Sequence, residues 1–215
     1  RRSSDLCINP TRDLIHPDDK KRQYAIDYIK YCIDAAQALE CNKTHFCFIT
    51  FPTNLNGNPR EKLEKTAIHV IAELAKYATN KGVTLMMEPL FKDDTSLVNR
   101  TEQAVALFSQ ALSMDAESFL QEKHQFGLLL DIFHMHHEEQ DPLATIEKYL
   151  PKTYHMHVAD HPRGLDFARS DSNFVKKAMQ KLRSMHYNYF LSFESFDPEW
   201  NLDRLKNALD VLKSL

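Results

Sequence analysis

Four side chains that can bind a metal ion each stand at the end of an apolar or β-rich run of residues. The clearest is Asp131, which directly follows three leucines and precedes His134 by three positions. A buried carboxylate without a partner is costly, so a charged group in this position predicts a ligand or a counter-charge. Together the four offer three carboxylates and one imidazole, a set that suits Mn²⁺, Mg²⁺ or Co²⁺ and also accommodates Zn²⁺. The set is Glu88, Asp131, His157 and Glu194.

Other histidines and acids near these positions have simpler explanations. His134 is weaker evidence when taken alone, because a single histidine near a core is more often just hydrogen-bonded there. Alternate residues of a strand point to the same face, so His155 shares a face with His157 and lies one layer deeper in the predicted barrel. We interpret His155 as a supporting or structural residue. Residues 136–139 are polar and follow a predicted strand end, so we expect them in a solvated loop.

The elements that carry these residues alternate regularly between strand and helix. Helices are predicted by apolar residues at helical spacing and by end signals such as Asp18 or Asp19 at a start and Gly82 just past an end. Strands are predicted by short β-branched, aromatic or apolar runs. The predicted strands are a tail at 6–8, then 45–51, 83–89, 126–132, 153–159 and 189–194; the predicted helices are 20–39, 60–81, 100–114, 141–150, 172–186 and 200–215.

Repeated strand–helix units predict an α/β fold with a parallel sheet covered by helices. An open doubly wound sheet and a (β/α)₈ barrel both satisfy this pattern. The sequence contains no G-x-G-x-x-G or G-x-x-x-x-G-K-[ST] and only four glycines, which leaves a nucleotide cradle unsupported. A barrel also brings the carboxyl ends of all its strands to one mouth, where the four candidate ligands would meet. The barrel is therefore favoured.

Composition and charge limit the classes of molecule that the chain is expected to bind. With 27 basic and 30 acidic residues and a net charge of -3, the chain has no electrostatic footprint for nucleic acid and no basic run for a membrane surface. It lacks an apolar segment of about 18 residues and a signal-peptide pattern, so a cytoplasmic location is expected. The four cysteines form no C-x-x-C pair. A small molecule is the expected partner, and a homo-oligomer is left open.

The segment Leu130–Met135 with the trailing Glu138 and Glu139 resembles the metal-site segment of the D-tagatose and D-psicose 3-epimerases. These belong to the xylose-isomerase-like sugar phosphate isomerase/epimerase superfamily. The resemblance covers residues 6–215 and implies a (β/α)₈ TIM barrel. It implies that residues 1–215 form a single domain holding strands 3 to 8, with residues 6–9 as the third strand. The first two βα units, about 60 residues of a usual barrel of about 250, would then be absent from this sequence.

The resemblance also implies roles for individual residues. The family's metal-binding Asp stands three residues before a substrate-binding His, and its metal-binding His six residues before a substrate-binding Arg. Asn99 and Thr101 resemble the family's Asn-Thr turn. The implied metal ligands are Glu88, Asp131, His157 and Glu194, the implied acid/base pair is Glu88 and Glu194, and the implied substrate-binding residues are His134, Arg163 and Asp94.

The implied activity is a divalent-metal-dependent isomerase reaction on a ketose or related sugar, with Mn²⁺ favoured over Mg²⁺, Co²⁺ and Zn²⁺. The ion would hold a carbonyl and an adjacent hydroxyl oxygen and stabilise the enediolate. One glutamate would remove the proton from the intervening carbon and the other would return it on the opposite face, which is epimerisation. Return to the neighbouring carbon would be aldose–ketose isomerisation.

One departure from the family pattern keeps the substrate open. The family follows its first metal-binding Glu with Asn-Arg at the third and fourth positions and Glu at the sixth. This sequence has Phe91, Lys92 and Asp94 there, and Asp94 is interpreted as the substitute for that Glu. The sugar, and epimerisation against isomerisation, are therefore left undecided.

Three other functions on a barrel remain as alternatives. An inosose or dehydroshikimate dehydratase would use the same scaffold. An endonuclease IV-like phosphodiesterase would need more histidine ligands and a basic DNA surface, neither of which the sequence offers. A non-catalytic binding protein is disfavoured because a buried ligand quartet is costly to keep without an ion.

Overall fold

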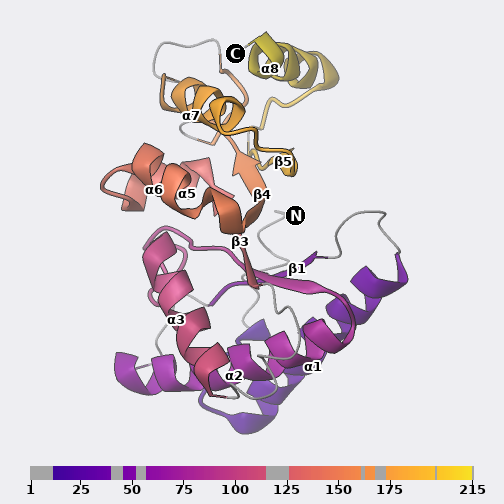
Figure 1. Cartoon of the computed structure of the whole chain (residues 1–215), viewed down its shortest axis with the longest axis vertical. Helices are drawn as coiled ribbons and strands as arrows, with labels where there is room; N and C mark the ends of the chain where they lie inside the picture. Colours follow the sequence, from indigo (N-terminus) through magenta and orange to yellow (C-terminus); the bar gives the residue numbers. More distant parts are fainter. Residues whose placement is uncertain are drawn as a thin grey trace. The chain divides into compact units, whose positions relative to one another are not determined.

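A computed structural model describes residues 12–39, 46–51, 57–114, 126–160, 163–167, 173–196 and 198–214, with the backbone alone at 46–48. The chain divides into two compact units, Arg1–Leu128 (unit 1) and Leu129–Leu215 (unit 2), and Figure 1 shows the elements of each. The strand predicted at residues 6–9 lies outside the described residues. That the whole chain forms one domain stays a prediction.

Unit 1 contains parallel strands in the order β1 (Phe46–Ile49), β2 (Thr84–Met87) and the start of β3 (Phe126–Asp131). The register aligns Ile49 with Met87, and Met87 with Leu128. Parallel strands buried on both faces are continuous apolar runs, and the side chains of β2 from Leu85 to Met87 are buried accordingly. The predicted parallel strands at these three places are confirmed, each within two residues of its expected ends.

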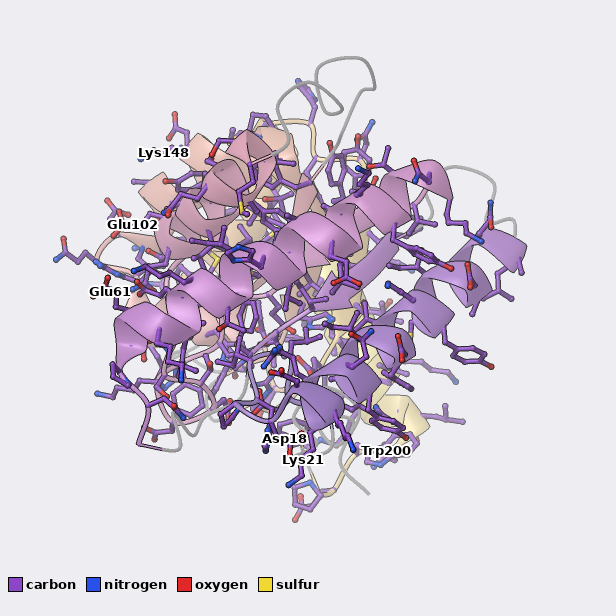
Figure 2. All side chains as sticks on the ribbon, turned by 90° about the horizontal axis from the view of Figure 1, so that it is seen from below. Asp18, Lys21, Glu61, Glu102, Lys148 and Trp200 are labelled. Atoms are coloured by element: carbon purple, nitrogen blue, oxygen red, sulfur yellow. The ribbon has the colours of Figure 1, made fainter. Side chains whose placement is uncertain are left out.

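Helices α1 (Asp19–Ala38) and α2 (Arg60–Asn80) flank β1 in the sequence. A capping side chain marks the start of α1, and a glycine follows the end of α2. The side chain of Asp18 accepts hydrogen bonds from the amides of Lys20 and Lys21, so it caps the first turn of α1. Figure 2 labels Asp18 at this end of the helix. Helix α2 ends before Gly82, whose φ of 67° is the left-handed conformation that glycine adopts without strain. Both predicted helices are confirmed.

Polar side chains join α1 to α2. Lys30 Nζ lies 2.6 Å from Glu73 Oε1 and Lys81 Nζ lies 2.8 Å from Asp34 Oδ1. The Tyr77 hydroxyl donates to the same Asp34 carboxylate. The apolar face of α2 is buried, and its residues are Leu63, Ala67, Val70, Ile71, Leu74, Ala75 and Ala78. Helix α3 (Thr101–Ser113) completes the described helices of unit 1 and confirms the prediction there.

Unit 2 holds the end of β3 followed by β4 (Thr153–Val158) and β5 (Phe190–Phe193), which pair in parallel. The register aligns His157 with Ser192 and Val158 with Phe193. Its remaining helices confirm the predicted ones within about two residues at each described end. They are α6 (Pro142–Tyr149), the 3₁₀ turn η3 (Leu150–Lys152), α7 (Asn173–Ser184) and α8 (Leu202–Ser214).

One element of unit 2 corrects the sequence analysis. Residues 136–139 were expected in a loop, but a short helix, α5 (Ile132–Glu138), starts directly after β3. The strand ends at Asp131 because its side chain accepts a hydrogen bond from the Phe133 amide at 2.8 Å and so caps the helix. His136 and His137 are nevertheless solvent-exposed, as expected.

Among the helices that the structure describes, none has both the length and the apolar character required to cross a bilayer.

Candidate functional site

Asp131 is the last residue of β3, and its fully buried side chain accepts hydrogen bonds from two different groups. Its Oδ1 atom accepts the hydrogen bond that caps α5, and its Oδ2 atom accepts one from Arg163 Nη2 at 2.7 Å. His134, one helical turn further on, places Nε2 3.6 Å from the same Oδ2 atom. The predicted Asp131–His134 pair is therefore brought together by the first turn of a helix.

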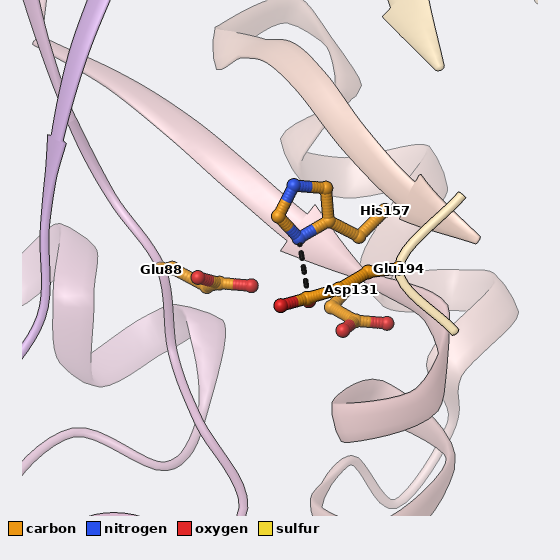
Figure 3. A group of neighbouring side chains, drawn as sticks. All are labelled: Glu88, Asp131, His157 and Glu194. Carbon is orange, nitrogen blue, oxygen red and sulfur yellow. Dashed lines mark ion pairs between the residues drawn. The ribbon is translucent and has the colours of Figure 1, made fainter. Parts of the chain in front are cut away.

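His157 and Glu194 meet at the carboxyl ends of β4 and β5. The Glu194 amide donates to the Val158 carbonyl at 3.3 Å, which continues the ladder between these strands by one residue. His157 Nδ1 lies 2.9 Å from Glu194 Oε2, the ion pair marked in Figure 3. Each of Asp131, His157 and Glu194 offers one ligand atom, and these atoms lie within 4.8 Å of one another. Three of the four predicted metal ligands are thus neighbours within unit 2.

The environment of Glu194 keeps it charged. Burial acts to raise the pKa of Glu194, but the hydrogen bond from His157 and the charge of Arg163 outweigh burial and hold the pKa well below its usual range. Arg163 Nη2 lies 2.5 Å from Glu194 Oε2. A carboxylate that stays ionised is available both to bind a cation and to accept a proton.

Arg163 connects the carboxylates of this group. Its Nη2 atom donates to both Asp131 and Glu194, and its side chain is 7% exposed. The centre of the guanidinium group lies 4.7 Å from the ring centroid of Phe133 and 4.7 Å from that of Phe196. Aromatic faces attract a cation, most strongly where water is excluded. The guanidinium group is therefore held by charge on two carboxylates and by two aromatic rings.

The backbone of Arg163 is also unusual. Its φ of 74° lies in the left-handed region, which is strained for a bulky residue. The Arg163 carbonyl accepts hydrogen bonds from the Ser195 hydroxyl and the Phe196 amide, both at 3.0 Å. These two bonds tie the turn that carries Arg163 to the segment after Glu194, so the strained residue is held at the carboxylates.

His134 is neutral in this setting. Burial, with a further contribution from the Arg163 charge, lowers the pKa of His134 to about 3. Arg163 Nη1 lies 3.3 Å from His134 Nε2, and a guanidinium group can only donate, so Nε2 is the acceptor and the ring proton is on Nδ1.

His155 lies one layer below His157 on β4, as predicted from the strand period. Its Nε2 atom contacts the Ser192 hydroxyl on β5, and its ring meets that of His157 edge-on with centroids 5.2 Å apart. Burial lowers the pKa of His155 to about 4, so this imidazole is neutral near pH 7. Its contacts fit the supporting role expected for it.

Unit 1 carries the other two predicted site residues. Glu88 directly follows β2, is 4% exposed, and donates from its amide to the Ile49 carbonyl at 3.2 Å. Asp94 is half-buried in a turn, where its backbone amide donates a hydrogen bond to the Phe91 carbonyl. The Asn99 side chain donates to the carbonyls of Leu90 and Thr95 and so closes this loop. Asn99 therefore holds the segment between Glu88 and α3 in shape.

A family model described as a xylose isomerase-like TIM barrel matches residues 4–215 of the chain. This chain belongs to the xylose isomerase-like TIM barrel family. The predicted family and the predicted barrel class are therefore confirmed. The prediction that two βα units are absent is not addressed by this match.

Relatives within this family include known or probable epimerases. A probable ketose 3-epimerase of Synechocystis sp. is 27% identical over 146 residues, which are 67% of this chain and 47% of that protein. An L-ribulose 3-epimerase of Mesorhizobium japonicum is 29% identical over 145 residues, 67% of this chain and 45% of that protein. The chain thus spans about half the length of the curated relatives it matches.

The fold is also similar to that of solved structures. A D-psicose 3-epimerase from Clostridium cellulolyticum H10, crystallised with D-tagatose, superimposes with a TM-score of 0.78. The identity is 17%, and the match covers 97% of this chain and 76% of that one. At this identity the likeness concerns the fold alone.

The donors of unit 2 fit a divalent cation. Two carboxylates and one imidazole are ligand types that Mn²⁺, Mg²⁺, Co²⁺ and Zn²⁺ accept in proteins. Two of these donors, Asp131 and Glu194, already share one positively charged partner in Arg163. The carboxylates of Asp131 and Glu194 are thus already arranged around a positive charge, and a metal ion is chemically compatible with them.

Sequence reasoning missed the residues that hold Arg163. Phe133, Ser195 and Phe196 each stand next to or near a predicted site residue, but no spacing rule points to them. The available signal was their place in the chain, since Phe133 precedes His134 and the pair Ser195–Phe196 follows Glu194. Their contacts depend on the left-handed turn at Arg163, which the sequence does not indicate.

Proposed function

We propose that this protein is a divalent-metal-dependent isomerase that epimerises a ketose or a related small sugar. The observation that carries the proposal is the group formed by Asp131, His157, Glu194 and Arg163 at the strand ends of unit 2. The sequence similarity to ketose 3-epimerases supports the choice of substrate class.

The proposed metal ligands are Asp131, His157 and Glu194, with Glu88 as the fourth, all labelled in Figure 3. Glu88 follows β2 immediately after Met87, which is in register with Leu128 on β3, and Asp131 stands three residues beyond Leu128. In this family's barrel the carboxyl ends of neighbouring parallel strands share one mouth. Mn²⁺ is the favoured ion, because three carboxylate oxygens and one imidazole nitrogen suit it.

The two glutamates would carry the proton. Glu194 is held ionised by His157 and Arg163, so it can accept a proton from the substrate carbon. Glu88 would return a proton on the opposite face, which inverts that carbon. A bound divalent ion would polarise the substrate carbonyl and adjacent hydroxyl and thereby make the carbon–hydrogen bond more acidic.

His134, Arg163 and Asp94 would hold the substrate. Neutral His134 carries its ring proton on Nδ1, while Nε2 faces the Arg163 guanidinium group. The Arg163 guanidinium group brings positive charge toward oxygen atoms that become negative during proton removal. Asp94 would accept hydrogen bonds from sugar hydroxyls from its turn in unit 1.

Two variants test the acid/base assignment. Glu88→Gln and Glu194→Gln should abolish exchange of the substrate C–H proton with deuterated solvent while circular dichroism stays unchanged. Glu102→Gln is a matched control, because Glu102 is exposed and its Oε1 atom lies 3.0 Å from Arg100 Nη2 at the start of α3. Full solvent-deuterium incorporation by either site variant would refute the assignment.

The reaction type is tested with a panel of ketoses and inososes in Mn²⁺ or Co²⁺, followed by NMR. An epimer as product supports the proposal, an aldose would assign isomerisation instead, and a dehydrated product would assign a dehydratase. Absence of bound divalent ion by elemental analysis, together with activity indifferent to EDTA, would count against the metal assignment.

A further inference from the structure

A buried hydroxyl group in unit 1 lies at the end of a strand that pairs with the strand leading to Glu88. Thr50 directly follows β1 and is 9% exposed. Its Oγ1 atom is buried, and no group in the described part of the chain hydrogen-bonds to it. A hydroxyl removed from water without a partner is unfavourable, whereas valine would fill nearly the same space at no such cost. The hydroxyl at this position therefore requires an explanation.

The register of unit 1 places Thr50 beside Glu88. Ile49 is aligned with Met87, so the next residues along the two strands, Thr50 and Glu88, are also side by side. The Glu88 amide donates to the Ile49 carbonyl, which shows that the pairing continues past the strand ends. Neighbouring strands lie about 4.8 Å apart, and aligned residues of a parallel pair point to the same face. The Thr50 hydroxyl and the Glu88 carboxylate thus belong to one face at one edge of the sheet.

We propose that Thr50 is a substrate-binding residue whose hydroxyl hydrogen-bonds to a hydroxyl group of the sugar next to the reacting carbon. The inference rests on the proposed function, because it takes Glu88 as an acid/base residue. A hydroxyl both donates and accepts, which suits a polyol ligand whose hydroxyls do the same. The unfavourable burial is relieved when the sugar binds, so the contact contributes to affinity for a ligand with a hydroxyl at this place and discriminates against one without it.

Three variants test this role in the metal-loaded protein. Thr50→Val removes the hydroxyl at nearly constant volume, and Thr50→Ser keeps it. Thr66→Val is the matched control, because the Thr66 hydroxyl already bonds to the Lys62 carbonyl on the exposed side of α2. Melting temperature and kcat/KM are measured with the ketose that the wild type turns over fastest.

Thr50→Val should lower kcat/KM about tenfold, the effect of one neutral hydrogen bond, without lowering the melting temperature. Thr50→Ser and Thr66→Val should stay within about threefold of the wild type. A kcat/KM of Thr50→Val within twofold of the wild type overturns the inference while the proposed function stands. A lower melting temperature with unchanged kcat/KM also overturns it, since that marks a purely structural hydroxyl. A wild type that neither binds nor converts any ketose overturns the proposed function and this inference together.

Discussion

Removing the charge of Arg163 tests whether the carboxylates of unit 2 need a cation. The Arg163 side chain is 7% exposed, that of Asp131 0% and that of Glu194 19%. Removing one partner of a buried ion pair leaves an uncompensated buried charge and costs about 3–5 kcal/mol. Glu194 keeps its contact with His157, so we expect Arg163→Met to lower the free energy of unfolding by about 3 kcal/mol, the lower end of that range.

A divalent ion should reverse this loss. A metal ion ligated by Asp131 and Glu194 would take the same carboxylate oxygens that Arg163 contacts, so in the wild type the two cations compete. A ligand that binds only the folded state at 100 times its Kd stabilises by about 2.7 kcal/mol. Mn²⁺ should therefore raise the stability of Arg163→Met by at least that amount, and more than it raises that of the wild type.

The assay is urea unfolding at pH 7 in EDTA and in excess Mn²⁺. Arg204→Ala is the control, because Arg204 pairs at 3.2 Å with a Glu199 side chain that is 84% exposed. An exposed pair of this kind contributes less than about 1 kcal/mol, so the control should change little in either condition. If Arg163→Met costs no more than Arg204→Ala in EDTA, or if Mn²⁺ stabilises wild type and variant equally, the reasoning about the shared carboxylates is refuted.

Two further predictions concern individual contacts. Ser195→Ala removes a hydrogen bond to the Arg163 carbonyl and should lower the free energy of unfolding by about 1 kcal/mol in urea titrations, and an unchanged midpoint would contradict it. The hydrogen bond from Lys81 lowers the pKa of Asp34 below its ordinary value of 3.8, so Asp34 stabilises the fold above that pH and the contribution disappears as pH falls through the lowered pKa. Melting curves from pH 6 to pH 3 should show Asp34→Asn less stable than the wild type at pH 6, by a margin that shrinks as the pH falls below 3.8; a constant difference would contradict this.

Local chemistry explains why most element ends could be predicted. An acidic N-cap such as Asp18 and a glycine such as Gly82 fix helix ends through bonds within a few residues, so their positions can be read from the sequence. The expectation that ligands at the ends of neighbouring strands meet has a different, non-local basis: β4 and β5 pair in register, and the Glu194 amide continues the ladder. It correctly predicted that His157 and Glu194 would be neighbours.

The contacts around Arg163 could not be predicted, since they depend on backbone geometry and not on residue type. Arg163 contacts Asp131 and Glu194 from a backbone whose φ is 74°, and the sequence carries no glycine or asparagine at that position to signal it. That the Thr50 hydroxyl has no hydrogen-bond partner among the described residues was also unpredictable, because the hydrogen bonding of a buried side chain depends on the packed structure. Both features lie beside predicted metal ligands. Functional sites are where local sequence preferences are most often overridden, so predictions from sequence are expected to fail there.

The spacing between Asp131 and His134 has a physical cause that the resemblance alone did not supply. A residue that caps a helix and the residue three positions later lie on the same side of the first turn. Asp131 uses Oδ1 for the cap and leaves Oδ2 for Arg163, so the strand end, the helix start and the charged group are fixed by one side chain. The short helix α5, whose residues 136–138 were expected in a loop, is therefore the element that brings the His134 ring to the carboxylates. A loop of the same length would leave that ring free to turn away, and the helix removes this freedom.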